Sequence, residues 1–239
     1  MFNGKMKKDR LSFKTEISHK TPPKKTLIFL CVAIFMAGLI ASPASSDEWS
    51  TLGAGLNANV ADLVFDGDGN LYAGGGFTDA GEVTKADYIA KWDGSAWSAV
   101  GSGMDKSVFA LVFDSDGNLY AGGEFTDAGG VSANRIAKWD GSDWSALGTG
   151  MDFYVDVLAF DNDGNLYAGG RFTKADGVAG TAKIAKWNGS AWSAVGGGLN
   201  NNVRALTFDR DGNLYVGGEF TDAGGVAGTA NIAKWDDSK

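Results

Sequence analysis

The sequence is poor in cysteine and histidine, and this shortage excludes several classes of enzyme. Of its 239 residues, one is cysteine and one is histidine. Both Cys31 and His19 precede residue 45, so a chain that begins there contains neither. Such a chain forms no disulfide, no cysteine nucleophile, no Ser-His-Asp triad and no zinc site with His or Cys ligands. Its stability must come from a hydrophobic core, which the remaining residues, about 195, are enough to build.

Basic residues are also scarce after the N-terminal segment. Residues 1–44 hold 8 of the 21 Lys and Arg and two acids, Asp9 and Glu16, which gives a net charge of +6. The rest of the chain holds 13 basic and 27 acidic residues, which gives −14. A body with this charge repels phosphates and anionic lipids, so we expect neither nucleic acid nor a membrane surface as a partner.

The N-terminal segment has the pattern of a secretory signal peptide. Lys24 and Lys25 precede an apolar run at 26–41, and small residues follow at Ser42 and Ala44. We predict a signal peptide at 1–44, so that residues 45–239 are secreted, periplasmic or on the cell surface. The apolar run is about 15 residues long, shorter than the roughly 20 that a spanning helix needs. An uncleaved membrane anchor remains the alternative, and it is the one link to a membrane that we expect.

No window after this segment has sustained helical periodicity, and the chain is instead a tandem repeat. The stretch FDGDGNLYAGGGFT begins at Phe65 and returns in related form at Phe113, Phe160 and Phe208, at intervals of 48, 47 and 48 residues. Such constancy indicates duplication of one structural unit. We place the repeats at about 49–96, 97–143, 144–191 and 192–239, within one domain at 45–239.

Each repeat contains four short β-rich runs, which we call strands A to D: VxALxF, NLYAGG, IAKW and WSALG. Gly, Asp, Asn or Ser bounds each run, as is typical of antiparallel strands. Strands B and C carry apolar or small residues on both faces, which indicates a sheet packed between two neighbours rather than one with a wet side. We therefore predict an all-β fold, a β-propeller of four four-stranded antiparallel blades. The glycine doublets let the next sheet approach closely, and the eight tryptophans are expected to fill the core between sheets.

The two ends of the repeat region suggest how the ring closes. The first strand D begins at Trp49, and the last repeat ends in strand C at Trp235. We predict that the N-terminal strand pairs with the last blade, completes it and closes the ring in a monomer. Two chains that share an eight-bladed ring are the alternative.

The repeat resembles the kelch type of propeller repeat. LYAGG is similar to the kelch strand that ends in Gly-Gly, IAKWDGS to the strand that follows, and WSALGTGM to the end of the repeat. The spacing is close to the roughly 50 residues of kelch. The GGxFT part is similar to glycine-rich repeats of extracellular bacterial and fungal propellers. The resemblance implies a blade and no activity: galactose oxidase, an enzyme of kelch type, binds copper through Tyr, His and a Tyr-Cys crosslink, and residues 45–239 have no His or Cys.

The motif D-x-D-G-N lies between strands A and B of every repeat. Alternating oxygen side chains before a glycine are typical of calcium loops, but here a strand follows at once and the later acidic ligand is missing. Gly and Asn at this place are also what a tight hairpin requires. We predict a turn and no cofactor, with calcium as the alternative at Asp66, Asp68, Asp114, Asp116, Asp161, Asp163, Asp209 and Asp211.

The copies differ most in the connections from strand D to the next strand A, which are expected to emerge at the same edge as the B-to-C connections. Amide, acidic and aromatic groups there suit a polar ligand, although loop drift among duplicated units explains the variation equally well. The predicted ligand-binding residues are Asn57, Asn59, Asp105, Lys106, Asp152, Phe153, Tyr154, Asn200, Asn201 and Asn202, with Glu124, Arg171 and Glu219 after the glycine doublets.

We therefore expect an exported, non-catalytic binding module for an extracellular glycan or protein. One alternative is a glycan-active enzyme that uses two carboxylates, because residues 45–239 contain four glutamates: Glu48, Glu82, Glu124 and Glu219. The other alternative is a structural surface repeat that binds no small ligand.

Overall fold

The computed structural model describes residues 48–236, nearly all of the compact unit Trp49–Lys239. These residues form strands, turns and loops, as expected, and over this range there is no helix that could cross a bilayer. The predicted signal peptide at 1–44, with Cys31 and His19, lies outside the described residues.

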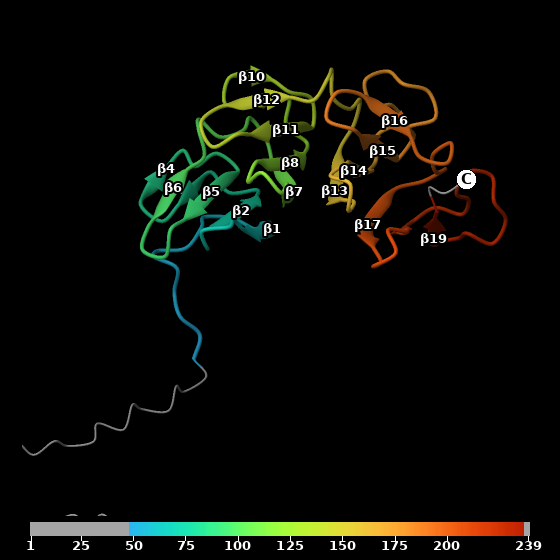
Figure 1. The fold of residues 1–239 in the computed structure, drawn as a ribbon. Coiled ribbons are helices and arrows are strands. Elements are labelled where there is room, and N and C mark those ends of the chain that lie inside the picture. The colour runs from blue at the N-terminus through green and yellow to red at the C-terminus, as the bar shows by residue number, and fades with distance from the viewer. Residues whose placement is uncertain (1–47, 237–239) are drawn as a thin grey trace, which may run out of the picture. The chain divides into compact units, whose positions relative to one another are not determined.

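The predicted runs A to D form the strands of four antiparallel sheets, which follow one another in chain order (Figure 1). The first sheet contains β1 (Val60–Phe65), β2 (Leu71–Gly75), β5 (Ile89–Trp92) and β6 (Trp97–Ala99). The second contains β7 (Val108–Phe113), β8 (Leu119–Gly123), β11 (Ile136–Trp139) and β12 (Trp144–Ala146). The third contains β13 (Val155–Phe160), β14 (Leu166–Gly170), β15 (Ile184–Trp187) and β16 (Trp192–Ala194). The fourth has three strands, β17 (Val203–Phe208), β18 (Leu214–Gly218) and β19 (Ile232–Trp235).

Short ladders tie the two kinds of loop together. The B-to-C loops of the first two sheets contain β3 (Asp79–Ala80) with β4 (Val83–Thr84), and β9 (Asp127–Ala128) with β10 (Val131–Ser132). Each D-to-A connection, or the segment before β1, forms a bridge to the following B-to-C loop, from Leu56 to Ala80 in the first repeat and from Met104 to Ala128 in the second. The two kinds of loop therefore lie at the same edge, as predicted.

The glycine doublets receive the side chains of the next sheet. A Cβ atom on Gly74 would lie 2.6 Å from Cγ1 of Val108, and one on Gly122 would lie 2.6 Å from Cγ1 of Val155. The same contact joins Gly169 to Val203. Each of these valines is fully buried, so the missing side chain of one sheet makes room for the first residue of the next strand A.

The tryptophans of strand D pack as expected. Trp97, Trp144 and Trp192 are buried, and their indole N–H groups donate to the carbonyls of Leu52, Val100 and Leu147 at 3.0, 3.2 and 3.0 Å. Each ring lies against the tryptophan of strand C in its own sheet, with centroids 5.3 to 5.5 Å apart. Trp49 differs, because its side chain is fully exposed, and the expectation of a core role was wrong for this residue.

Closure within the chain is not seen. Residues 49–55 form no strand, the fourth sheet has three strands, and none of the described residues provides its outer strand. The first and fourth sheets each keep one exposed face, which is described below. The predicted pairing of the N-terminal strand with the last blade is therefore absent. In a four-bladed ring, each sheet is rotated by a quarter turn from the one before it. The three valine-to-glycine contacts here leave Val60 of the first sheet and Ile232 of the fourth sheet exposed, so the two outer sheets do not meet.

Candidate functional site: the loop rim

The D-x-D-G-N motifs form hairpin turns at the edge opposite these loops. In the first turn, Oδ1 of Asp66 accepts the backbone N–H groups of Asp68 and Asn70 at 3.0 and 2.8 Å, and Oδ2 accepts the Asn70 amide at 2.8 Å. Gly69 has φ of +84°, which favours glycine. Burial alone would raise the pKa of Asp66, but these hydrogen bonds and Lys91 lower it. The turn prediction is confirmed.

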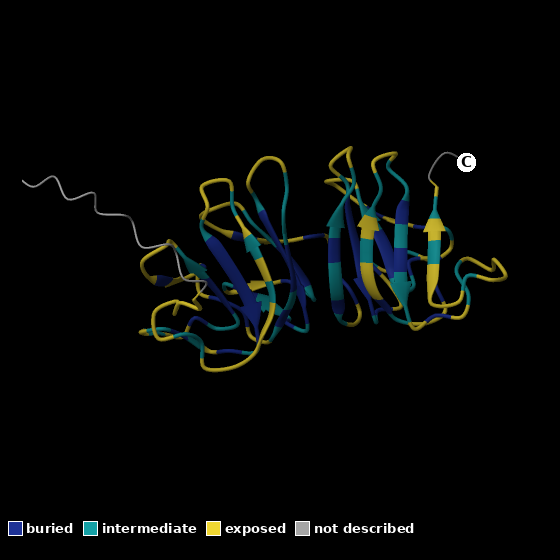
Figure 2. Cartoon of the chain, turned by 90° about the horizontal axis from the view of Figure 1, so that it is seen from below, coloured by how far each residue is buried: buried dark blue, intermediate teal, exposed yellow. Residues whose placement is uncertain are grey.

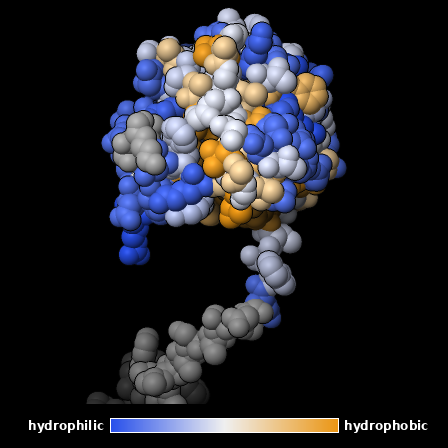
Figure 3. Space-filling view, turned by 90° about the vertical axis from the view of Figure 1, so that its right-hand side faces the viewer, coloured by the Kyte–Doolittle hydropathy of each residue, from blue (hydrophilic) through white to orange (hydrophobic). Residues whose placement is uncertain are grey.

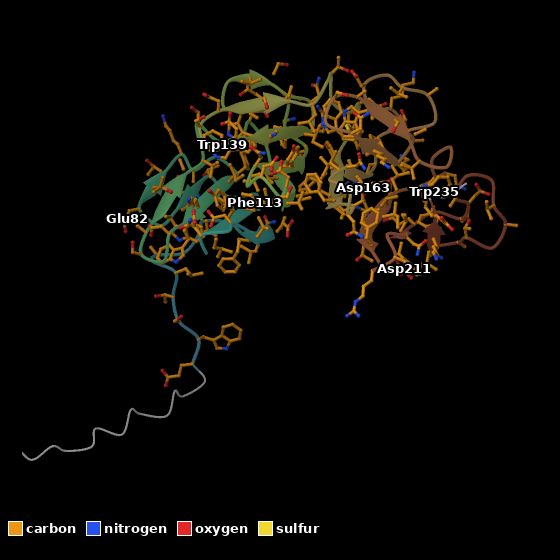
Figure 4. All side chains as sticks on the ribbon, viewed as in Figure 1. Glu82, Phe113, Trp139, Asp163, Asp211 and Trp235 are labelled. Atoms are coloured by element: carbon orange, nitrogen blue, oxygen red, sulfur yellow. The ribbon has the colours of Figure 1, made fainter. Side chains whose placement is uncertain are left out.

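This geometry leaves few oxygen atoms for a cation. The first aspartates, Asp66, Asp114, Asp161 and Asp209, each bind their own turn. Of the second aspartates, Figure 4 labels Asp163 and Asp211, which lie in the turns after β13 and β17. In residues 48–236 no three His, Cys, Asp or Glu side chains are grouped so that they could hold a metal ion.

We call the opposite edge, formed by the D-to-A and B-to-C loops, the rim. Four of its predicted ligand-binding residues hold the loops themselves. Asp105 accepts the Thr126 N–H at 2.7 Å, the Asp127 N–H at 3.0 Å and the Thr126 hydroxyl at 2.7 Å. Burial would raise the pKa of Asp105, but these hydrogen bonds lower it. The equivalent residues bind their own loops in the same way: Asn57, Asp152 and Asn200.

The next two residues of the third D-to-A loop form an aromatic platform. The rings of Phe153 and Tyr154 stack with centroids 4.1 Å apart, and 43% of Phe153 is exposed. Phe109, from the second sheet, lies edge-on to Tyr154 with a centroid distance of 6.1 Å. The guanidinium of Arg171 lies 5.5 Å from the centroid of the Tyr154 ring, where a cation is attracted by the π face. The structure thus brings together three predicted site residues.

An ion network continues from this platform into the fourth sheet. One carboxylate oxygen of Asp156 binds Nε of Arg171 at 2.9 Å and Nη1 of Arg204 at 3.0 Å. Arg204 also binds Glu219 at 2.7 Å, and the Asn202 amide donates to Glu219 at 2.9 Å. The hydrogen bonds to Arg204 and Asn202 lower the pKa of Glu219, and the bond to Glu219 raises the pKa of Arg204. Asn201 joins the network by donating to the Glu219 carbonyl at 3.2 Å.

The remaining predicted site residues come from the first and second repeats. Asn59 lies beside Gly76, whose Cβ would be 2.7 Å from the Asn59 side-chain oxygen. Glu124 donates its backbone N–H to Ser107. Within residues 48–236, the hydrogen bonds and ion pairs of the network around Asp156 do not include Asn59, Glu124 or Lys106.

Sequence reasoning missed Phe109, Asp156 and Arg204. All three occupy the second position of strand A, where the first repeat has Ala61. Variation at one position of an otherwise constant strand was the signal that could have found them.

A second missed set precedes strand C in each repeat. These residues, Tyr88, Arg135, Lys183 and Asn231, all have φ between +63° and +72° and differ from copy to copy. Arg135 lines a surface pocket of about 380 Å³ at the rim, together with Asn134, Thr149, Met151, Asp152 and Lys174. Arg135 and Lys174 give this pocket two cationic side chains, and its lining residue Asp152 directly precedes Phe153 in the chain.

Comparisons with known proteins agree on the fold. A model described as a β-propeller domain of unknown function (DUF5122) matches residues 115–140, and the two component regulator propeller matches residues 197–220. No curated protein matches the chain. The chain is thus a β-propeller repeat protein, and the kelch type in particular stays a prediction.

Two solved structures illustrate the similarity. The extracellular domain of a protein described as a one-component system from B. thetaiotaomicron is 11% identical, with a TM-score of 0.50 over 77% of this chain and 22% of that chain. A chain of the mitotic checkpoint complex is 15% identical, with a TM-score of 0.50 over 77% of this chain and 50% of that chain. The chain thus spans half or less of the length of these proteins, and at such identity the likeness concerns the fold alone.

Proposed function

We propose that this chain is an exported, non-catalytic binding module whose rim binds a polar extracellular ligand, a glycan or an extended peptide. The observation that carries the proposal is the platform of Phe153 and Tyr154 beside Arg171, because an exposed aromatic ring and fixed charges meet at one place. Phe153 is 43% exposed, and Asp156 holds Arg171 together with Arg204 of the fourth repeat. A flat aromatic ring stacks on a sugar or a peptide plane, and the adjoining charges orient its polar groups.

The arrangement of variable and constant residues supports a role in recognition. The constant residues of the repeat form the valine-to-glycine contacts and the hairpin turns, whereas the rim holds the copy-specific residues of strand A and the loops. Loops on a rigid scaffold are where proteins place their binding residues. Asp156 fixes both arginines, so their positive charges are held in place before a ligand arrives.

Two observations support export. Residues 1–44 have the composition of a signal peptide, and one of the similar solved structures is an extracellular domain. The acidic body, which carries −14 after residue 44, is consistent with a ligand that is neither nucleic acid nor an anionic lipid surface.

The state of Glu219 argues against this residue as the general acid of a glycoside hydrolase. A general acid for glycoside hydrolysis needs a raised pKa, but the hydrogen bonds from Arg204 and Asn202 lower the pKa of Glu219. If the chain is instead a glycan-active enzyme, purified protein will release sugars, and Glu124→Gln or Glu219→Gln will abolish the release.

The test is a screen of the purified chain on arrays of oligosaccharides and extended peptides, followed by titration of the strongest probe. We expect Phe153→Ala to raise the Kd at least about tenfold, since hot-spot aromatics cost over 1 kcal/mol when truncated. Asp163→Ala is the control, because Asp163 lies in a hairpin turn at the edge opposite the rim, and its Kd should stay near that of the unmodified chain. Unchanged binding in Phe153→Ala, or no bound probe at all, contradicts the proposal.

A further inference from the structure

The first sheet exposes a face whose counterparts in the other sheets are buried or half-buried. Val60, Leu63 and Phe65 of β1 are 38%, 55% and 65% exposed. Their counterparts in β7, Val108 and Leu111, are 0% and 6% exposed because the preceding sheet covers them. Adjacent exposed apolar side chains of this kind mark an interaction surface.

The fourth sheet exposes the opposite face, and that face has an empty socket. Ile232 of β19 is 67% exposed, whereas its counterparts in the first three sheets are fully buried. A Cβ atom on Gly217 would meet only Ala205 at 3.6 Å and a backbone oxygen at 4.0 Å, so the place that the next valine fills at Gly74 is open. In Figure 2, β19, the strand nearest the C-terminus, is exposed along much of its length.

A pocket in the fourth sheet corresponds to the place of a tryptophan elsewhere. In the second sheet, Trp144 lies among Val100, Met104, Ala128 and Trp139. The same positions of the fourth sheet line an apolar pocket of about 170 Å³, formed by Val195, Leu199, Val216, Ala223 and Trp235. Figure 3 views this end of the molecule, where hydrophobic residues lie among hydrophilic ones.

The segment before the first sheet carries the matching tryptophan. WSTLGAGL from Trp49 corresponds to WSAVGSGM from Trp97, and Trp49 is fully exposed. Trp49 precedes Val60 by 11 residues, the same spacing that separates Trp97 from Val108 and Trp192 from Val203. One segment therefore presents the tryptophan and the valine at the spacing that the pocket and the Gly217 socket require.

We propose that two copies of this chain join head to tail into an eight-bladed ring. Residues 49–52 of each copy form the outer strand of the other copy's fourth sheet, and the face of Val60, Leu63 and Phe65 covers the face of Gly217 and Ile232. The contact repeats the three junctions within one chain. The contact is heterologous, because it joins the first sheet of one copy to the fourth sheet of the other. Two such contacts form only if the two copies close into a ring. A ring of eight blades is within the range of known propellers.

A second copy fits better than the same chain because the two faces of one chain stay apart. Val60 and Ile232 are both exposed in the structure, although three junctions already link the four sheets. The two faces are also apolar, so a copy that covers both removes the exposed hydrophobic surface without leaving a new edge.

The first test measures the mass of the full chain in solution over a dilution series, by light scattering coupled to size-exclusion chromatography. We expect twice the mass of one chain.

Gly217→Val fills the socket within its own sheet, where Ala205 leaves room for the side chain, and should raise the dissociation constant of the dimer at least about tenfold. Trp49→Ser changes a side chain without contacts in the isolated chain and should weaken the dimer while leaving its fold intact. Val131→Glu, on an exposed loop strand away from both faces, is the control and should remain dimeric.

A mixing experiment tests the head-to-tail direction. Leu63→Glu blocks one face and Gly217→Val blocks the other, so each variant alone should dimerise at least about tenfold more weakly than the unmodified chain. An equal mixture keeps one intact junction between the two variants and should form a heterodimer of intermediate affinity. Circular dichroism of each variant checks that it is folded.

Three results would overturn the proposal. These are a particle of one chain's mass at every concentration, a particle larger than two chains, or a dimer that Gly217→Val and Trp49→Ser leave unchanged.

Discussion

Two side chains, aspartate and asparagine, hold the same turn between strands C and D. Oδ1 of Asp93 accepts the N–H groups of Ser95 and Ala96, both at 2.8 Å, and Oδ1 of Asp140 does the same for Ser142 and Asp143, at 2.9 and 2.8 Å. In the third repeat, the amide oxygen of Asn188 takes this role. The hydrogen bonds to Ala96 and Ser95 lower the pKa of Asp93 from 3.8 to about 2.

This difference predicts a pH dependence that asparagine abolishes. The folded pKa of Asp93 and of Asp140 lies near 2, below the ordinary value of 3.8, so each carboxylate stabilises the fold above about pH 4 and loses this effect as the pH falls towards 2. We expect Asp93→Asn with Asp140→Asn to remain folded and to lose less stability than the unmodified chain between pH 4 and pH 2. Urea unfolding at both pH values measures this, and an equal loss in both proteins would contradict the assignment.

At the scale of elements, the sequence predicted the long strands better than the short ladders and the side-chain contacts between sheets. Strands A to D are found at the predicted runs, except for the strand D expected at Trp49, because glycine-bounded apolar runs identify strands locally. The small ladders of β3 with β4 and β9 with β10 were missed, because two-residue strands leave no periodic pattern. The Asp156 network was missed for another reason: Arg204 comes 48 residues later, and spacing alone does not show which side chains of neighbouring sheets meet.

The junction between sheets makes a second prediction, about packing. Gly122→Ala places a methyl group 2.6 Å from Cγ1 of the stiff Val155 side chain, so the two sheets must separate or Val155 must leave its rotamer. We expect a loss of about 1–3 kcal/mol in the free energy of unfolding, measured in urea. Gly67→Ala is the control, because nothing lies within 4 Å of its Cβ position, and it should change stability by less than about 0.5 kcal/mol. Equal stability of Gly122→Ala and the unmodified chain would show that the sheets are not in close contact.

At the scale of the whole molecule, the repeat predicted the propeller fold, but it did not predict whether the first and last sheets meet and close the ring. Internal junctions are three copies of one contact, so the β-propeller could be predicted from the glycine doublets and the tryptophans. Closure could not, because it depends on the angle between sheets, which small packing differences set and no motif encodes. The arrangement of the rim was only partly predictable: Phe153, Tyr154 and Arg171 meet there, but Asn57, Asp105, Asp152 and Asn200 hold their own loops.

The claim on which the functional account depends is that the two edges of the blades differ, with recognition at the rim and structure at the hairpin turns. The most direct measurement compares the Kd of one bound array probe for Phe153→Ala, at the rim, and for Asp163→Ala, at the opposite edge, by isothermal titration calorimetry. We predict a Kd at least about tenfold higher for Phe153→Ala and an unchanged Kd for Asp163→Ala. An unchanged Kd for Phe153→Ala with weaker binding by Asp163→Ala would contradict the account.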